Sequence, residues 1–434
     1  MRKVWFAVAT VVVLGAGYLG AQAYSSHVFE RELSRTLEHA RANPQWQVTR
    51  DEVERGWFHS RGRLQLSHID NAQWRLSLPY DARHGLLSTR ISGALQGYRH
   101  EASNTSGEGR NDSVESPVQG RTALFGDILD SAEPRWVTTL HTLDRRAKGR
   151  LDIPSFTLSR EEGQLSSEGA EFTLDGHVSD ISIKGSIAPL KLRSEAAKIV
   201  TGPLSIDSRY QVADGGKSLF QHSELSLDRL HYTNRQQAPI TLLGLSYEGD
   251  SRLDDQLTIN ASIALDEARV AGEAMLSGRL DVRLDRLNGN AVRRLQSQSA
   301  QLIEEQGGDF WSLSDAQRKT LIRRLESSLL ATLVDSPRFN LEGITLQSAL
   351  FGVDVRGHGE LIFEGDDSQA LDIEALLNGN AQAWREHLNG GFSWQGVPPL
   401  VALQLGLPPG TRQVDMQIER GNVLVNGRPL PPSL

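Results

Sequence analysis

The sequence predicts an α+β protein, mainly antiparallel β, with a single N-terminal transmembrane helix and a large β-rich body. An uncharged run, Val4 to Ala23, follows Arg2 and Lys3 at the start of the chain. Beyond it, apolar and polar residues alternate over long stretches, which is the pattern of half-buried strands. Two segments within residues 290–334 instead repeat their apolar residues at helical spacing. The 40 glycines exceed the roughly 7% of average proteins, so many turns are expected.

Residues 1–24 predict a membrane anchor. The uncharged run is about as long as the roughly 20 apolar residues that cross a bilayer as a helix. Its cationic flank favours a cytoplasmic start, so residues 25–434 would cross to the other side. A cleaved signal peptide is the alternative, because Ala21-Gln22-Ala23 has the small-x-small pattern of a cleavage site. Both interpretations export residues 25–434, and the anchor makes the membrane a partner.

The residues after the anchor predict a helix. Ser25-Ser26 can cap it, and Asn43-Pro44 ends it. Its apolar positions recur at helical spacing at Phe29, Leu33, Leu37 and Ala40. We expect the first core-packing helix of the body; a spacer or dimerising stalk is the alternative.

From Trp46 the period changes to two, which predicts antiparallel strands. The clearest strand runs from Leu276 to Leu284, where apolar residues alternate with Ser277, Arg279, Asp281 and Arg283. Leu257 to Leu265 alternates in the same way. Because successive side chains of a strand point to opposite faces, this sheet should have one apolar face and one charged, solvated face.

Both ends of the chain resemble the YdgA-like family of bacterial envelope proteins. The resemblance rests on Glu54-Arg55-Gly56-Trp57-Phe58-His59-Ser60, on His84-Gly85-Leu86, and on a closing strand with an Asn426-Gly427 turn. Leu86 stands where that family usually has proline. The resemblance implies a protein of uncharacterised function in the inner membrane, single-pass, with most of the chain in the periplasm.

Two features of this N-terminal half have a structural and a functional interpretation. Exposed aromatics often mark binding surfaces, but we expect Trp57 and Phe58 to plug the core beneath the preceding turn. For His84 we expect a turn histidine without a role as ligand or base. Residues 101–118 are polar and rich in Gly, Ser and Asn, which predicts a mobile surface loop.

A helical pair is predicted at residues 290–334. The first helix spans Asn290 to Gln306, and a capping box from Ser314 to Gln317 begins the second. Asp335-Ser336-Pro337 ends the pair. We expect these helices to cover the apolar face of the neighbouring sheet.

The sequence gives no candidate catalytic, cofactor-binding or metal-binding residue. The chain has no cysteine, its twelve histidines are scattered, and its net charge of −8 with no basic run argues against nucleic acid. Gly216-Lys217-Ser218 lacks the first glycine of a phosphate loop, and Gly244 to Glu248 lacks the last glycine of a hydrolase elbow. The acidic pairs Asp254-Asp255 and Asp366-Asp367 have no further ligands at recognisable spacing.

These observations favour a non-enzymatic binding or scaffolding body over an enzyme. The alternative is a lipid-handling β-groove similar to AsmA-type envelope proteins, in which Leu276 to Leu284 would shelter acyl chains. An open groove would favour lipid handling, and a core sealed by residues 290–334 would argue against it. A hydrolase, assembled from distant residues, is less favoured. A lipid or an envelope protein is the expected partner.

Overall fold

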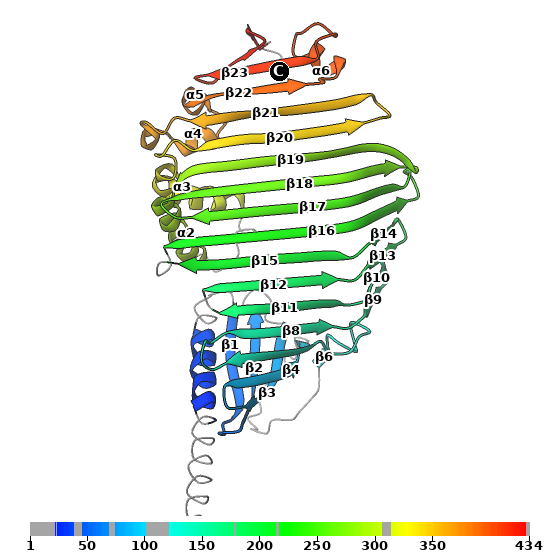
Figure 1. Ribbon diagram of the computed structural model, residues 1–434, viewed down its shortest axis with the longest axis vertical. Coiled ribbons are helices and arrows are strands. Elements are labelled where there is room, and N and C mark those ends of the chain that lie inside the picture. The colour runs from blue at the N-terminus through cyan, green and yellow to red at the C-terminus, as the bar shows by residue number, and fades with distance from the viewer. Residues whose placement is uncertain are drawn as a thin grey trace, which may run out of the picture. The chain divides into compact units, whose positions relative to one another are not determined.

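The computed structural model describes residues 22, 24–38, 46–68, 74–100, 121–177, 179–213, 217–305 and 314–430. The chain divides into two compact units, Met1–Ala188 and Pro189–Leu434. Most of the described residues form antiparallel β-sheet (Figure 1), which agrees with the alternation in the sequence. We refer to the two parts as unit 1 and unit 2 and describe each by itself.

Unit 1 contains a helix over residues 24–38 and twelve described strands. The strands are β1 (Trp46–Glu54), β2 (His59–His68), β3 (Trp74–His84), β4 (Ser88–Ala94), β5 (Gln96–His100), β6 (Arg121–Ala123), β7 (Arg135–His141), β8 (Ala147–Ile153), β9 (Phe156–Arg160), β10 (Gly163–Ser167), β11 (Ala170–His177) and β12 (Asp180–Ile187). Strand β3 pairs with β2 on one side and, on the other, with β5 near its start and β4 near its end. From β4 the sheet continues through β7, β8 and β11 to β12.

The helix of unit 1 seals an apolar cluster against this sheet. Phe29, Tyr80 and Ala82 are buried there, and Leu33 and Trp136 pack around them. The helix therefore acts as the first core-packing helix of the body, because one apolar stripe of the expected spacing faces the sheet.

The predicted N-terminal transmembrane helix and single-pass location in the inner membrane are corrected by the structure. Among the described residues, no helix combines the length and the apolar character needed to cross a membrane. The described helix carries Glu30, Arg31, Glu32 and Arg35, and charged side chains are costly in a bilayer. Among the described residues the fold class is therefore mainly antiparallel β. Residues 1–21 and the predicted loop at 101–118 lie outside the described residues.

Unit 2 is a meander of long strands, with most of its helices near one end of the strands and its last helix near the other (Figure 1). Its strands are β13 (Leu190–Ser194), β14 (Ala197–Thr201), β15 (Leu204–Ala213), β16 (Ser218–Asn234), β17 (Ile240–Leu253), β18 (Gln256–Val270), β19 (Glu273–Asn288), β20 (Arg338–Ser348), β21 (Val353–Phe363), β22 (Leu388–Gln395), β23 (Gln413–Glu419), β24 (Asn422–Val425) and β25 (Arg428–Pro429). Its helices are α2 (Gly289–Glu305), α3 (Asp315–Ala331), η4 (Ser368–Ala370), α4 (Ile373–Leu377), α5 (Gln382–Glu386) and α6 (Pro399–Gln404). Each strand from β16 to β25 pairs with the next.

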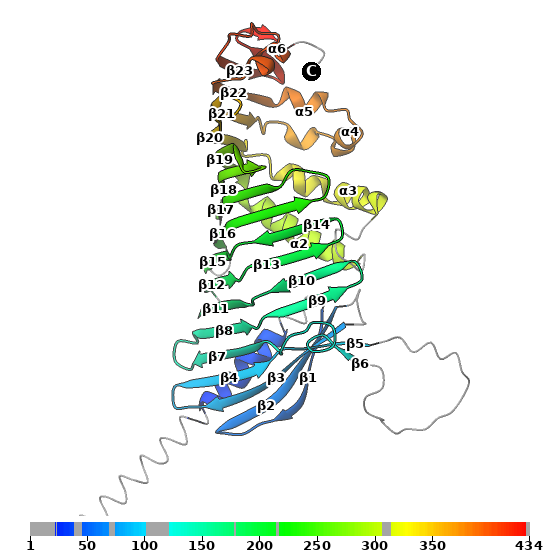
Figure 2. The same ribbon diagram turned by 90° about the vertical axis from the view of Figure 1, so that its right-hand side faces the viewer.

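The predicted helical pair is present as α2 and α3. The Ser314 hydroxyl accepts from the backbone N–H of Gln317, whose side chain accepts from the Ser314 N–H, so the capping box forms. The two helices pack on each other through Leu321 and Leu325 of α3 with Leu295 of α2. Figure 2 shows them beside the strands and not spread across the sheet.

A bend divides the long strands of unit 2. Strand β16 pairs with β15 up to Leu227 and with β14 from Leu230 onward. At the same level, Gly244 of β17 has a positive φ of 59° and drops out of the register. A Cβ there would lie 1.9 Å from the carboxylate of Asp266, so only glycine fits without displacing it. These irregularities let the strands curve at this end (Figure 1).

Candidate apolar binding site

The register of unit 2 sorts its side chains onto two different faces. On β18, Ile259 and Ile263 point to one face, while Asn260 and Ala264 point to the other. Ile263 stands between Tyr247 of β17 and Leu280 of β19. Because this pairing is kept from strand to strand, apolar residues line up across the sheet.

We call the aligned apolar side chains of β15 to β20 the apolar face. It comprises Leu204, Ile206, Tyr210, Val212, Leu225, Leu227, Leu245, Tyr247, Leu257, Ile259, Ile263, Leu265, Leu280, Val282, Leu284, Ile344 and Leu346. None of these side chains is buried, and Ile263 is 46% exposed, whereas Leu253 and Leu341, which pair with Leu257 and Val282 on the same face, are buried. Contiguous exposed apolar surface of this kind marks binding sites in soluble proteins.

The helices of unit 2 leave the middle of the apolar face open. Leu330 of α3 packs with Leu371, Ile373 and, at the end of β21, Phe363. The predicted covering helices thus cover only one end of the strands. Val282 and Leu284 of β19, at the centre of the predicted alternation, remain half-buried.

A terminal pocket adjoins the apolar face near the bend. Its volume is about 520 Å³, and Leu346 belongs both to it and to the apolar face. The pocket is lined by side chains from five strands, the β20–β21 turn and α6, including Leu276, Val353, Val355, Trp394, Val401, Leu405, Val414 and Met416. Its lining is almost wholly apolar. Sequence reasoning missed it because its walls come from residues 276 to 416, which only the folded sheet brings together.

Two polar groups belong to the lining of the terminal pocket. The Ser348 hydroxyl accepts a hydrogen bond of 3.4 Å from the Phe351 backbone N–H. The Trp394 indole N–H is buried and has no protein partner. The pocket thus lacks the set of converging charged groups that chemistry on a substrate needs.

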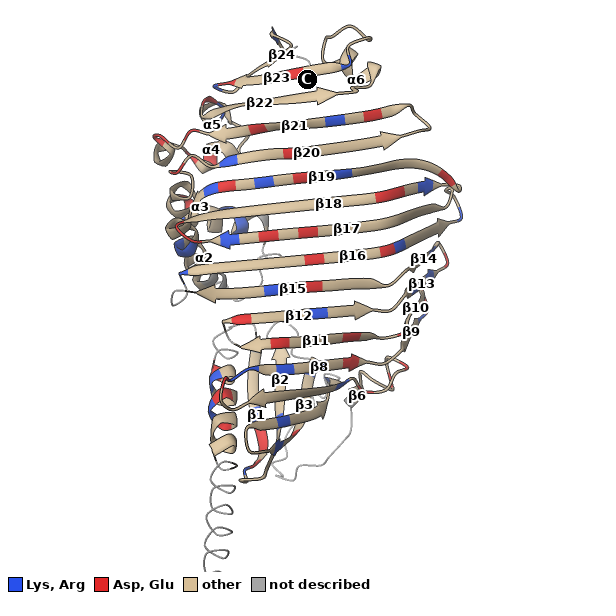
Figure 3. Ribbon diagram, in the orientation of Figure 1, with Lys and Arg blue, Asp and Glu red and all other residues tan. Residues whose placement is uncertain are grey.

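The opposite face of the same sheet is charged and solvated, as predicted for β19. Figure 3 shows acidic and basic residues along these strands. Arg279 pairs with Asp281 at 2.9 Å on β19 and lowers the pKa of that carboxyl. These neighbouring ion pairs keep one face wet while the other stays apolar.

On this charged face, His222, Glu248 and Asp250 could together hold a metal ion. Their potential ligand atoms lie within 4.8 Å of one another. His222 Nδ1 is 2.8 Å from an Asp250 oxygen, and this contact raises the pKa of His222. The histidine and carboxylate satisfy each other as an ion pair, so the cluster is explained without an ion.

The sequence motifs that fell short of known sites remain unassembled. Ser246 lies within β17, opposite Ser226 and Ala264, and not on a strand-to-helix elbow. Asp254 pairs with Arg252 at 3.3 Å next to the turn that follows β17. Asp367 precedes the short helix η4 without a side-chain capping bond. Gly216 lies outside the described residues.

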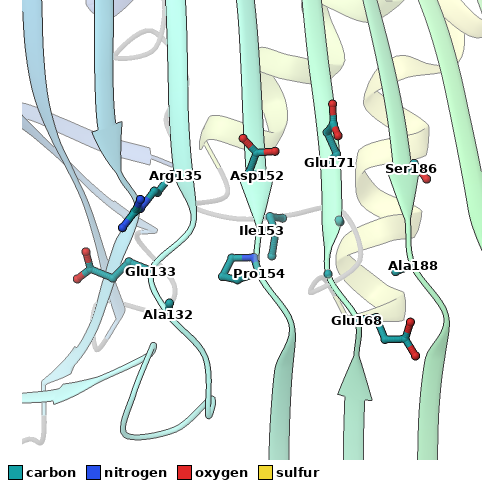
Figure 4. A pocket seen from close by; sticks show the side chains of 12 residues that line it. Ala132, Glu133, Arg135, Asp152, Ile153, Pro154, Glu168, Glu171, Ser186 and Ala188 are labelled. Carbon is teal, nitrogen blue, oxygen red and sulfur yellow. The ribbon is translucent and has the colours of Figure 1, made fainter.

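A second cavity of about 540 Å³ lies in unit 1, lined by residues from β7, β8, β11, β12 and the segments joined to them. Glu133, Asp152, Glu168 and Glu171 stand around it; Asp152 and Glu171 point the same way, whereas Glu133 and Glu168 point away from them (Figure 4). Asp152 and Glu171 each contact Arg150. The arrangement offers no convergent acid and base.

The Gly-Trp-Phe motif differs from its expected role. Trp57 is 62% exposed and Phe58 is 51% exposed, so neither plugs the core. His84 ends β3 and is buried, with Ser60 Oγ 2.9 Å from its Nε2 and Thr89 Oγ1 3.0 Å from its Nδ1. Burial lowers the pKa of His84. The serine is itself fully buried, which prevents it from reaching a substrate.

Residues 1–383 match the model of a bacterial protein family of unknown function, DUF945. The chain belongs to this family. No curated protein and no solved structure matches it. The assignment to DUF945 makes it an uncharacterised bacterial protein, and the finer YdgA-like resemblance is not confirmed by a named relative.

Proposed function

We propose that this DUF945 protein binds the acyl chains of lipids along the apolar face and in the terminal pocket of unit 2. The observation that carries the proposal is the exposure of the apolar face, which the described helices cover only at one end of the strands. Burying apolar surface is favourable by roughly 25 cal/mol per Å². Covering this open face with an apolar ligand is therefore expected to be favourable.

The shape of the apolar surface favours a chain over a compact ligand. The apolar face extends over six neighbouring strands, and it continues into a pocket whose lining has almost no polar surface. Binding pockets for compact, functionalised molecules usually place several polar groups to orient the ligand. Here the described polar groups are one hydroxyl and one indole N–H, which suits a hydrocarbon chain.

The same geometry supports a binding protein over an enzyme. Neither cavity described above brings together a nucleophile, a base and an oxyanion-stabilising group. The similarity to AsmA-type grooves stays an analogy of pattern: one apolar and one charged face on a long sheet.

The test is native mass spectrometry with lipid extraction on the full chain. We expect bound lipid in near-stoichiometric amount. In Ile263→Glu, a charge on the apolar face should reduce lipid occupancy by about tenfold, because a carboxylate beside a hydrocarbon chain must be desolvated.

The matched control is Ala264→Glu, which places the same charge one residue further on, opposite Arg279 on the charged face. This variant should keep its lipid. A lipid-free chain, or equal loss in both variants, would contradict the proposal.

A further inference from the structure

Three turns of unit 1 and its helix gather six large exposed apolar side chains. We call this group the aromatic turn patch: Tyr24, Trp57, Phe58, Leu86, Leu87 and Leu143. Their exposed fractions lie between 44% and 74%. Tyr24 lies on the helix of residues 24–38, and the others lie on the β1–β2, β3–β4 and β7–β8 turns.

Hydrogen bonds fix these segments beside one another. The Ser26 hydroxyl donates to the carbonyl of Gly56 at 3.0 Å, and the Ser25 hydroxyl donates to that of Leu86 at 3.1 Å. The Thr142 N–H donates to the Leu87 carbonyl, and the His84 N–H to that of Phe58, both at 2.8 Å. These hydrogen bonds join the helix and the turns that carry the exposed side chains, and they pair backbone carbonyls of those turns.

Arginines lie next to the aromatic turn patch in the chain. Three carboxylates of unit 1 are each shared between two arginines: Glu30 between Arg50 and Arg55, Asp81 between Arg61 and Arg83, and Glu32 between Arg35 and Arg145.

Three of these arginines, Arg55, Arg83 and Arg145, are within three residues of a patch residue in the chain and have mostly exposed side chains. Because each carboxylate is shared by two arginines, these ion pairs carry a net positive charge. Glu54 and Asp144 on the same turns offset it in part. Tryptophan and tyrosine, with arginine beside them, are the residues enriched where proteins meet lipid headgroups.

We propose that the aromatic turn patch docks against a phospholipid surface, with its apolar side chains among the upper acyl chains and its arginines at the phosphate groups. Apolar side chains supply affinity in such contacts, and anionic lipids add attraction for each nearby cation. This docking is a separate property of unit 1 and does not depend on lipid binding by unit 2.

The absence of cysteine from the chain allows a local test. Leu87→Cys in the full chain is labelled with the polarity-sensitive fluorophore NBD and mixed with vesicles of phosphatidylcholine, with or without phosphatidylglycerol. Ile183→Cys on β12, a 39% exposed apolar position in the same unit, is the control. We expect the label at position 87 alone to enter the lipid, shown by quenching from brominated acyl chains, and to do so at lower lipid concentration on anionic vesicles.

Adding Trp57→Ser and Phe58→Ser should raise the lipid concentration for half-maximal quenching by about a hundredfold, since each large apolar side chain contributes about a factor of ten. A label at position 87 that stays in water while the chain sediments with vesicles would overturn the proposal. So would a shift without vesicles that grows with protein concentration, because a second copy would then be the occupant. Equal quenching on vesicles with and without phosphatidylglycerol would contradict the proposed contact between the arginines and the phosphate groups.

Discussion

Phe29 of unit 1 is 3% exposed, whereas Ile263 of unit 2 is 46% exposed, although each belongs to the apolar side of its element. In unit 1 a helix lies on the sheet and excludes water from Phe29, Tyr80 and Ala82. In unit 2, α2 and α3 pack mainly on each other and at one strand end, so the middle of the apolar face remains open. Apolar patterning therefore serves folding in the first case and remains available for a ligand in the second.

The largest expected effect is on the sealed cluster of unit 1. Phe29→Ala should lower the free energy of unfolding by about 3–5 kcal/mol, because it removes a buried ring and leaves a cavity. Urea denaturation followed by fluorescence measures this, and Trp136 beside the cluster reports on it. A loss below about 1 kcal/mol would mean that the cluster is not sealed.

Filling the terminal pocket should affect binding more than folding. Val355→Trp places a large side chain in the pocket, and we expect the Kd for a fluorescent fatty acid to rise by about tenfold, which corresponds to about 1.4 kcal/mol. Arg356→Trp is the control, because its side chain points to the other face. Equal Kd values for the wild type and both variants would remove the pocket from the binding site.

The buried histidine should make the stability of unit 1 depend on pH. Burial lowers the pKa of His84 below its ordinary value of about 6.5, so the unfolded chain binds a proton more readily than the folded chain. The contribution of His84 to the free energy of unfolding is therefore complete above about pH 6.5. It is lost as the pH falls through the lowered pKa of His84 in the folded chain.

Urea denaturation between pH 7.5 and pH 5 should show this loss. His84→Gln should reduce the dependence, since glutamine does not titrate. An unchanged pH dependence in His84→Gln would assign the effect to other groups. Glu30 is one such group. Burial raises its pKa, but contact with Arg50 lowers it by more, so its contribution to stability is lost only at more acidic pH.

The smallest effect is expected on the open face. Ile263→Ala should cost less than about 1 kcal/mol of unfolding free energy in the lipid-free chain, because the side chain is already half in water. The same denaturation experiment measures it. A cost as large as that of Phe29→Ala would show that the apolar face is closed in solution.

The sequence predicted the local features of unit 2 well. Alternation identified the two faces of β18 and β19, and the capping box at Ser314 marked the start of α3, because both signals depend on neighbouring residues. The period shows which face is apolar but not what covers it. For this reason the position of α2 and α3 at one strand end could not be predicted.

In unit 1 the sequence predicted less of the structure. Trp57 and Phe58 were predicted to be buried, but they occupy a turn whose exposure depends on segments far away in the sequence. The N-terminal apolar run suggested a transmembrane helix by composition alone, and no such helix exists among the residues that the structure describes. The terminal pocket needed five strands in register, which no local pattern specifies.

The most direct test of lipid binding is photo-crosslinking of the full chain with a diazirine-bearing fatty acid, followed by peptide mapping. We predict adducts on apolar-face residues of β16 to β20 and on the lining of the terminal pocket, with none on Ala264 or Arg279 of the charged face. Adducts spread equally over both faces of the sheet, or absent from unit 2, would contradict the proposal.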